Sequence, residues 1–130
     1  RFEADRRALS YCNAGHNPPL LLRGREQAEP PRQWLQPTGA AIGLAESFDF
    51  REETVALAPQ DAFVLYTDGI TEAMNQTQEE FGEARLAQIA AQFCNDPPQD
   101  LIRHVRLALR DFTGKKGFAD DVTLVVGRIK

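Results

Sequence analysis

The stretch Leu65-Tyr66-Thr67-Asp68-Gly69-Ile70-Thr71 ends an apolar run in an Asp-Gly step. A carboxylate at the point where a strand stops can project into a site as a rigid ligand, because the sheet already holds the backbone before it. A second stretch of this kind lies near the C-terminus, where Asp120-Asp121 precedes the apolar run Val122–Val126. If these two strand ends meet in the fold, Asp68 and Asp120 would supply the hard oxygen ligands that Mg²⁺ or Mn²⁺ prefer.

Each of these polar residues also has a purely structural interpretation. Asp68 could cap the helical turn that follows it, and Asp120 or Asp121 could mark a turn before a strand. Apolar residues flank both segments, however, where half-burying an unpaired charge is unfavourable, and this favours the metal-ligand interpretation. Glu72 could support a ligand or be a solvated helix residue, and His16 could bond within its own turn or have a chemical role.

The composition is that of one globular domain with a single core: 130 residues, 42% apolar and 26% charged. A net charge of −4 disfavours nucleic acid as a partner, and the basic cluster Lys115-Lys116 is too small for a nucleic-acid footprint. No apolar stretch approaches the roughly 20 residues of a spanning helix, so no membrane contact by this chain is expected. Cys12 and Cys94 form no Cys-x-x-Cys motif, which favours two reduced, buried thiols in a cytoplasmic protein.

Turn residues predict two β-hairpins in the first half of the chain. The predicted hairpins are Ala8–Cys12 with Pro19–Arg23, and Phe48–Leu57 with Ala62–Thr67. The first turn would be Gly15-His16-Asn17-Pro18 and the second Ala58–Asp61. Between the hairpins, the polar and Pro-rich stretch Gly24–Gln36 predicts an exposed loop that Trp34 and Leu35 anchor against the core.

Apolar residues at helical spacing predict two helices in the second half, over Glu80–Cys94 and over Gln99–Phe112, the latter ended by Gly114. A short helical turn is expected over Ile70–Met74, and a last strand over Val122–Ile129. Strands first, then two helices, then a strand is the order of an α+β fold, with helices packed on a mostly antiparallel sheet.

Four motifs occur in order along almost the whole chain. They are Asn13-Ala14-Gly15-His16-Asn17-Pro18-Pro19-Leu20-Leu21-Leu22, Leu65-Tyr66-Thr67-Asp68-Gly69-Ile70-Thr71-Glu72-Ala73, Phe81-Gly82-x-x-Arg85-Leu86 and Asp120-Asp121-Val122-Thr123-Leu124-Val125-Val126. In this combination the chain resembles the SpoIIE-like branch of the PPM-type (phosphatase 2C-like) serine/threonine protein phosphatases. The resemblance implies an αββα sandwich, that is, two antiparallel sheets flanked by helices.

The resemblance also implies a site for two Mn²⁺ or Mg²⁺ ions between the sheets, whose bridging water attacks a phosphoserine or phosphothreonine in line. Asp68 matches the family's catalytic metal ligand in the Thr-Asp-Gly motif, and Asp120 matches the ligand in the Asp-(Asp or Asn)-x-Thr motif. Gly69 and Asp121 are their neighbours, and Asp121 is expected to orient or support rather than to ligate.

Two departures from the family pattern set limits on the chain. Nothing in it matches the earlier Asp-x-x-Gly-His-Gly-like segment, whose Asp bridges the two metals, so residues 1–130 are expected to be the C-terminal portion of a single phosphatase domain. Such a fragment should bind metal weakly, show little activity alone, and tend to dimerise through its unpaired sheet edge. At the position of the family's Gly-Asp-Ser segment stands Gly15-His16-Asn17, so no third metal is expected there.

These expectations describe an enzyme of bacterial signalling. The resemblance implies a phosphorylated protein substrate, in this branch typically a STAS-type anti-anti-sigma factor that is freed to sequester an anti-sigma factor. The alternative is a catalytically incomplete module that keeps the partner-binding surface without the chemistry.

Overall fold

The computed structural model describes residues 1–24, 32–43, 49–114 and 120–130. In these residues two antiparallel sheets lie one against the other, with strand orders β1-β2-β5 and β4-β3-β6-β7. The strands are β1 (Phe2–Glu3), β2 (Ala8–Tyr11), β3 (Leu20–Leu22), β4 (Arg32–Trp34), β5 (Glu53–Ala56), β6 (Ala62–Tyr66) and β7 (Leu124–Arg128). A short 3₁₀ turn over Ala4–Arg6 joins β1 to β2.

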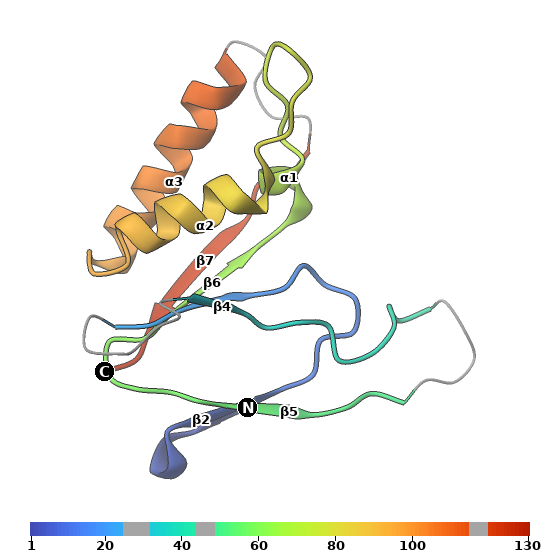
Figure 1. The fold of residues 1–130 in the computed structure, drawn as a ribbon, viewed down its shortest axis with the longest axis vertical. Helices are drawn as coiled ribbons and strands as arrows, with labels where there is room; N and C mark the ends of the chain where they lie inside the picture. The colour runs from blue at the N-terminus through green and yellow to red at the C-terminus, as the bar shows by residue number, and fades with distance from the viewer. Residues whose placement is uncertain (25–31, 44–48, 115–119) are drawn as a thin grey trace.

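The helices form a layer on one face of the four-stranded sheet, opposite the three-stranded sheet (Figure 1). They are α1 (Asp68–Thr71), α2 (Gly82–Gln92) and α3 (Pro98–Thr113). The predicted α2 and α3 are confirmed to within two residues at each end, and Gly114 follows the last residue of α3 with a φ of 61°. The α+β class and the two antiparallel sheets are therefore as predicted.

The predicted hairpin between Ala8–Cys12 and Pro19–Arg23 is wrong, because β2 and β3 belong to different sheets. The intervening turn carries the chain from one sheet to the other. Asn13 fixes this turn with its side chain, which accepts from the backbone N–H of His16 and donates to the carbonyl of His16. Gly15 adopts a φ of +94° there, a conformation that L side chains rarely adopt.

The second predicted hairpin is also wrong, since β5 pairs with β2 whereas β6 pairs with β3 and β7. The turn Ala58–Asp61 again switches sheets, and the buried carboxylate of Asp61 holds it. One oxygen of Asp61 accepts from the N–H of Gly24 at 2.9 Å, and the other accepts from Arg23 at 2.9 Å and from the N–H of Ala58 at 3.0 Å. These bonds tie the turn to the end of β3.

Part of the stretch Gly24–Gln36 forms a strand where an exposed loop was predicted. β4 pairs antiparallel with β3, with Leu20 opposite Trp34. The anchoring by Trp34 and Leu35 is confirmed, because Leu35 is buried and the Trp34 ring packs edge-on against Tyr66. Residues 25–31 lie outside the described part of the chain, as do Phe48 and Lys115-Lys116.

β3 is an interior strand of the four-stranded sheet and is buried on both faces. Leu20 and Leu22 face the larger cluster beneath the helices, whereas Leu21 packs with Val55 and Leu57 between the two sheets. All three leucines of β3 are at most 1% exposed, which makes this strand the centre of the core.

Two expectations from composition have mixed outcomes. Both cysteines are free, but Cys12 is exposed, so its predicted burial is wrong. Among the described residues, no helix has the length and apolar character needed to cross a membrane.

The Asp61 bonds generate a stability prediction. Asp61→Ala should lower the free energy of unfolding by about 3 kcal/mol, because it leaves the backbone donors of the turn and the partly buried Arg23 without their acceptor. Urea denaturation of both proteins measures this difference. Asp5→Ala, at an exposed position, is the matched control and should stay within about 0.5 kcal/mol of the unmodified chain. Equal effects of the two substitutions would contradict the proposed role of Asp61.

Candidate metal centre

The two Asp-containing segments lie at the same end of the four-stranded sheet. β6 and β7 pair antiparallel with Tyr66 opposite Leu124, so the end of β6 lies beside the beginning of β7. The pairing extends one step further, because the N–H of Thr67 donates to the carbonyl of Thr123 at 3.2 Å. Asp68 therefore follows β6 at the same end of the sheet where the segment that begins at Asp120 enters β7.

The side chain of Thr67 joins these segments directly. Its hydroxyl donates to the carbonyl of Asp121 at 2.9 Å and accepts from the N–H of Thr123 at 3.0 Å. These bonds hold residues 121–123 against the end of β6, the strand that precedes Asp68.

Gly69 is required here for space. A Cβ added at Gly69 would lie 2.5 Å from the carbonyl oxygen of Asp121 and 3.5 Å from the carbonyl carbon of Asp120. Any side chain would force these backbones apart, so the Asp-Gly step permits the close approach of the two loops. The predicted neighbours Gly69 and Asp121 are in contact through their backbones.

The carboxylates of Asp68 and Asp120 have the same local geometry. One oxygen of Asp68 accepts from the N–H of Gly69 at 2.9 Å, and one oxygen of Asp120 accepts from the N–H of Asp121 at 2.7 Å. Both residues are exposed, and within the described chain neither forms an ion pair. Each carboxylate is oriented by one bond and keeps its second oxygen for a ligand.

These groups fit the first part of a site for a hard cation. Carboxylate oxygens on adjacent loops are the donors that Mg²⁺ and Mn²⁺ take. In residues 1–24, 32–43, 49–114 and 120–130, no group of three or more His, Cys, Asp or Glu side chains is arranged to hold a metal ion. The described residues thus offer part of a ligand set, and the assignment of Asp68 and Asp120 as ligands stays a prediction.

The other candidates have structural roles in these contacts. Asp68 is the first residue of α1, and its carboxylate accepts from the N–H of Gly69 in the first turn of that helix, so it also has the local helix-start contact of the structural interpretation. Glu72 is exposed, and its backbone N–H donates to the carbonyl of Asp68. His16 is exposed and its Nδ1 lies 2.9 Å from the carbonyl of Asn17, as the turn interpretation predicts.

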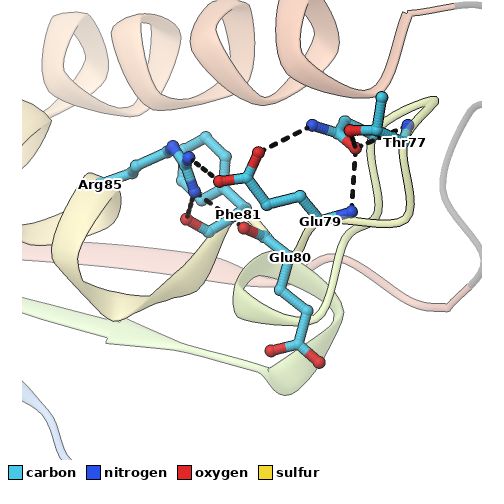
Figure 2. A network of polar contacts seen from close by, with 6 residues as sticks. Thr77, Glu79, Glu80, Phe81 and Arg85 are labelled. Atoms are coloured by element: carbon cyan, nitrogen blue, oxygen red, sulfur yellow. Dashed lines mark hydrogen bonds and ion pairs between the residues drawn. The ribbon is translucent and has the colours of Figure 1, made fainter.

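The sequence interpretation missed a polar network just after α1, centred on Arg85 (Figure 2). Arg85 donates to the carbonyls of Glu80 and Phe81, pairs with the carboxylate of Glu79, and lies over the ring of Phe112. The hydrogen bond and the charge of Arg85 hold the pKa of Glu79 below its usual range. The spacing in Phe81-Gly82-x-x-Arg85 was the available signal, since it lets a helix residue bind the carbonyls at the start of its own helix.

A second link runs from β6 to α2. The hydroxyl of Tyr66 donates to the carboxylate of Glu83 at 3.1 Å. Burial raises the pKa of Tyr66 above its usual value, and the negative charge of Glu83 raises it further. Tyr66 stays protonated as a donor, two residues before Asp68, and ties this strand end to the helix layer.

Comparison with known proteins gives a consistent set of relatives. The family model described as Stage II sporulation protein E (SpoIIE) matches residues 1–130. Protein IcfG of Synechocystis sp. is 31% identical over 124 residues, and phosphoserine phosphatase RsbU of Bacillus subtilis is 26% identical over 133 residues. Among solved structures, the SiaA-PP2C domain of Pseudomonas aeruginosa is similar with a TM-score of 0.81 at 26% identity.

These matches cover nearly all of this chain but only part of each relative. They include 90% of this chain with 18% of IcfG, 99% with 37% of RsbU, and 96% with 48% of the SiaA chain. The chain therefore spans less than half the length of each of these relatives.

The close approach at Gly69 generates a prediction. Gly69→Ala should lower the free energy of unfolding by about 1–3 kcal/mol, because the new Cβ meets backbone that cannot turn aside as a side chain would. The amide NMR signals of Asp120 and Asp121 should shift in the same variant. Gly127→Ala is the matched control, because a Cβ at that position has no neighbour within 4 Å. Unshifted signals in Gly69→Ala, or an equal loss of stability in both variants, would show that the contact does not hold the two loops together.

Proposed function

This chain belongs to the Stage II sporulation protein E (SpoIIE) family, and we propose that it is the C-terminal portion of a metal-dependent protein serine/threonine phosphatase domain. The observation that carries the proposal is the contact between the Asp68 and Asp120 loops through Thr67 and Gly69. This contact brings the exposed carboxylates of Asp68 and Asp120, each oriented by a backbone N–H, to the same end of the sheet. Two Mn²⁺ or Mg²⁺ ions are the cofactors that we propose for the complete domain.

The residues of this chain would divide the work as follows. Asp68 and Asp120 would hold metal through their second carboxylate oxygens, while Thr67 and Gly69 keep the two loops at a fixed separation. Bound metal would supply an activated water and neutralise charge on the phosphoryl oxygens. Asp121 would support the site through its backbone, because its carbonyl is engaged by Thr67.

We propose that the substrate is a phosphoserine on a regulatory protein, of the STAS-type anti-anti-sigma class. The relative RsbU is named a phosphoserine phosphatase, which supports phosphoserine over other phosphoryl groups. The free thiols of Cys12 and Cys94 fit the reducing conditions of the cytoplasm, where we propose that the domain acts.

The exposed apolar surface supports the proposal that these residues are one part of a larger domain. Leu65 and Val125 are cross-strand partners of β6 and β7, yet they are 42% and 53% exposed. They line an apolar cavity of about 520 Å³ on the face of the four-stranded sheet away from the helices. Apolar surface of this kind is normally covered, and it would favour association of the fragment with another chain.

The alternative function is a partner-binding module without catalysis. The incomplete ligand set in the described residues favours it, because a dinuclear site needs a further bridging carboxylate. The two functions differ in turnover, which an assay of the fragment beside the full-length protein measures.

In the complete domain, Asp68→Asn and Asp120→Asn should each lower phosphatase activity by at least about a hundredfold. The amide keeps the shape of the side chain but removes the ligand charge, and even outer partners of metal ligands contribute effects of this size. Hydrolysis of p-nitrophenyl phosphate with saturating Mn²⁺ measures the loss, with Asp5→Asn as an exposed control. Turnover near that of the unmodified domain in either variant would exclude its aspartate from the site.

The 130-residue chain alone should show little or no Mn²⁺-dependent activity. Two carboxylates offer too few ligands to fix two ions about 3.5–4 Å apart. The fragment and the full-length product of its gene should be assayed side by side on a phosphoserine peptide. Activity in the full-length protein alone supports the phosphatase proposal, and activity in neither supports the binding module. Comparable rates would mean that these residues contain a sufficient ligand set and that our assignment of the site is wrong.

A further inference from the structure

A cavity of about 730 Å³ runs between α3 and the beginning of β7. Among the described strands, β7 lies at one edge of the four-stranded sheet, and α3 lies alongside it (Figure 1). Asp120 and Asp121 line the cavity together with three arginines of α3, Arg103, Arg106 and Arg110. We call this cavity the α3 arginine groove. It adjoins the candidate metal centre because Asp120 belongs to both.

The three arginines share one face of α3. Their spacing of three and four residues places them one above another along the helix. Arg103 pairs with Asp100 at 2.9 Å, and Arg110 lies 3.9 Å from Asp111, both at exposed positions. Exposed ion pairs of this kind are weak, so a stronger anion can displace them.

Arg106 differs from the other two arginines. It is exposed, and it has no hydrogen bond or ion pair with any of the described residues. A guanidinium group binds carboxylate and phosphate in a bidentate geometry. Among the described residues, Arg106 is therefore the groove arginine that has no anionic partner.

The groove also has an apolar side. Leu107 is 40% exposed, and Ile102, Val122 and Leu124 line the same cavity. Apolar contacts flanked by arginines suit a peptide segment better than a free phosphate ion, since they bury side chains next to the charged groups.

We propose that the α3 arginine groove docks the acidic segment that carries the phosphoserine of the protein substrate. This inference rests on the proposed phosphatase function, because the substrate of a phosphatase would bring a dianionic phosphoserine beside Asp120. The chain as a whole has a net charge of −4 and repels acidic proteins. In the groove three arginines outnumber the two carboxylates of Asp120 and Asp121, so the lining is locally positive. This local positive charge would offset the repulsion and set the orientation of the partner.

The test is a titration of the metal-free full-length protein with a fluorescein-labelled phosphoserine peptide of about 12 residues that has Asp and Glu around the phosphoserine. Fluorescence anisotropy should show saturable binding that weakens as salt is raised. Arg106→Glu combined with Arg110→Glu should weaken binding at least about tenfold, since it removes two guanidinium donors and adds two carboxylates that repel the acidic peptide. The milder variant Arg106→Gln should weaken it in the same direction, and circular dichroism verifies that each variant is folded.

The control is Arg51→Glu, which reverses one charge, as is done at each groove arginine, at an exposed arginine outside the groove. It should bind the peptide like the unmodified chain. A peptide with Lys around the phosphoserine should bind more weakly than the acidic peptide. No binding of the acidic peptide, equal binding by the double variant, or an equal loss in Arg51→Glu would each overturn the docking proposal.

The titration uses neither metal nor turnover, so it fails independently of the phosphatase assay. Groove-dependent binding without hydrolysis by the full-length protein would support docking and contradict the proposed enzymatic function. Hydrolysis of the acidic phosphoserine peptide by that protein, with binding unaffected by the double variant, would contradict the groove alone.

Discussion

The hydroxyl of Thr67 makes the two hydrogen bonds on which the candidate metal centre depends. It donates to the carbonyl of Asp121 and accepts from the N–H of Thr123, so it extends the β6–β7 pairing past the end of the regular ladder. Gly69 completes the arrangement by leaving room for the Asp121 carbonyl. The regular β7 ladder begins only at Leu124, so these contacts and the bond from the N–H of Thr67 to the carbonyl of Thr123 join residues 121–123 to the end of β6.

The rest of the fold holds this end of the four-stranded sheet in place. The buried carboxylate of Asp61 ties the turn before β6 to the end of β3, and β3 is the strand with both faces in the core. At the other end of β6, Tyr66 bonds to Glu83 of α2. β6 is thus held at its beginning, along its length and at its end, which makes Asp68 a rigidly placed residue rather than part of a mobile loop.

Features that depend on a local pattern could be predicted from the sequence. The pairing of strands depends on distant residues and could not be predicted. α2 and α3 were predictable because apolar residues such as Leu101, Val105 and Leu109 recur at helical spacing within one segment. The strand pairing was not predictable, because strands that are adjacent in the chain need not pair with each other. The bonds of Asp61 to Arg23 and Gly24 also join segments that lie far apart in the sequence. Asp68 and Asp120 could be selected from their places at strand ends and from the family resemblance. The hydrogen bonds by which Thr67 links the two segments are visible only in the structure.

Whether Asp68 and Asp120 share one metal centre can be measured by anomalous diffraction from crystals of the chain soaked in a high concentration of Mn²⁺. We expect a manganese peak within about 2.0–2.6 Å of an oxygen of each carboxylate, with the two carboxylates about 5 Å apart. Carboxylates more than about 10 Å apart, or manganese bound only elsewhere, would contradict a shared metal centre.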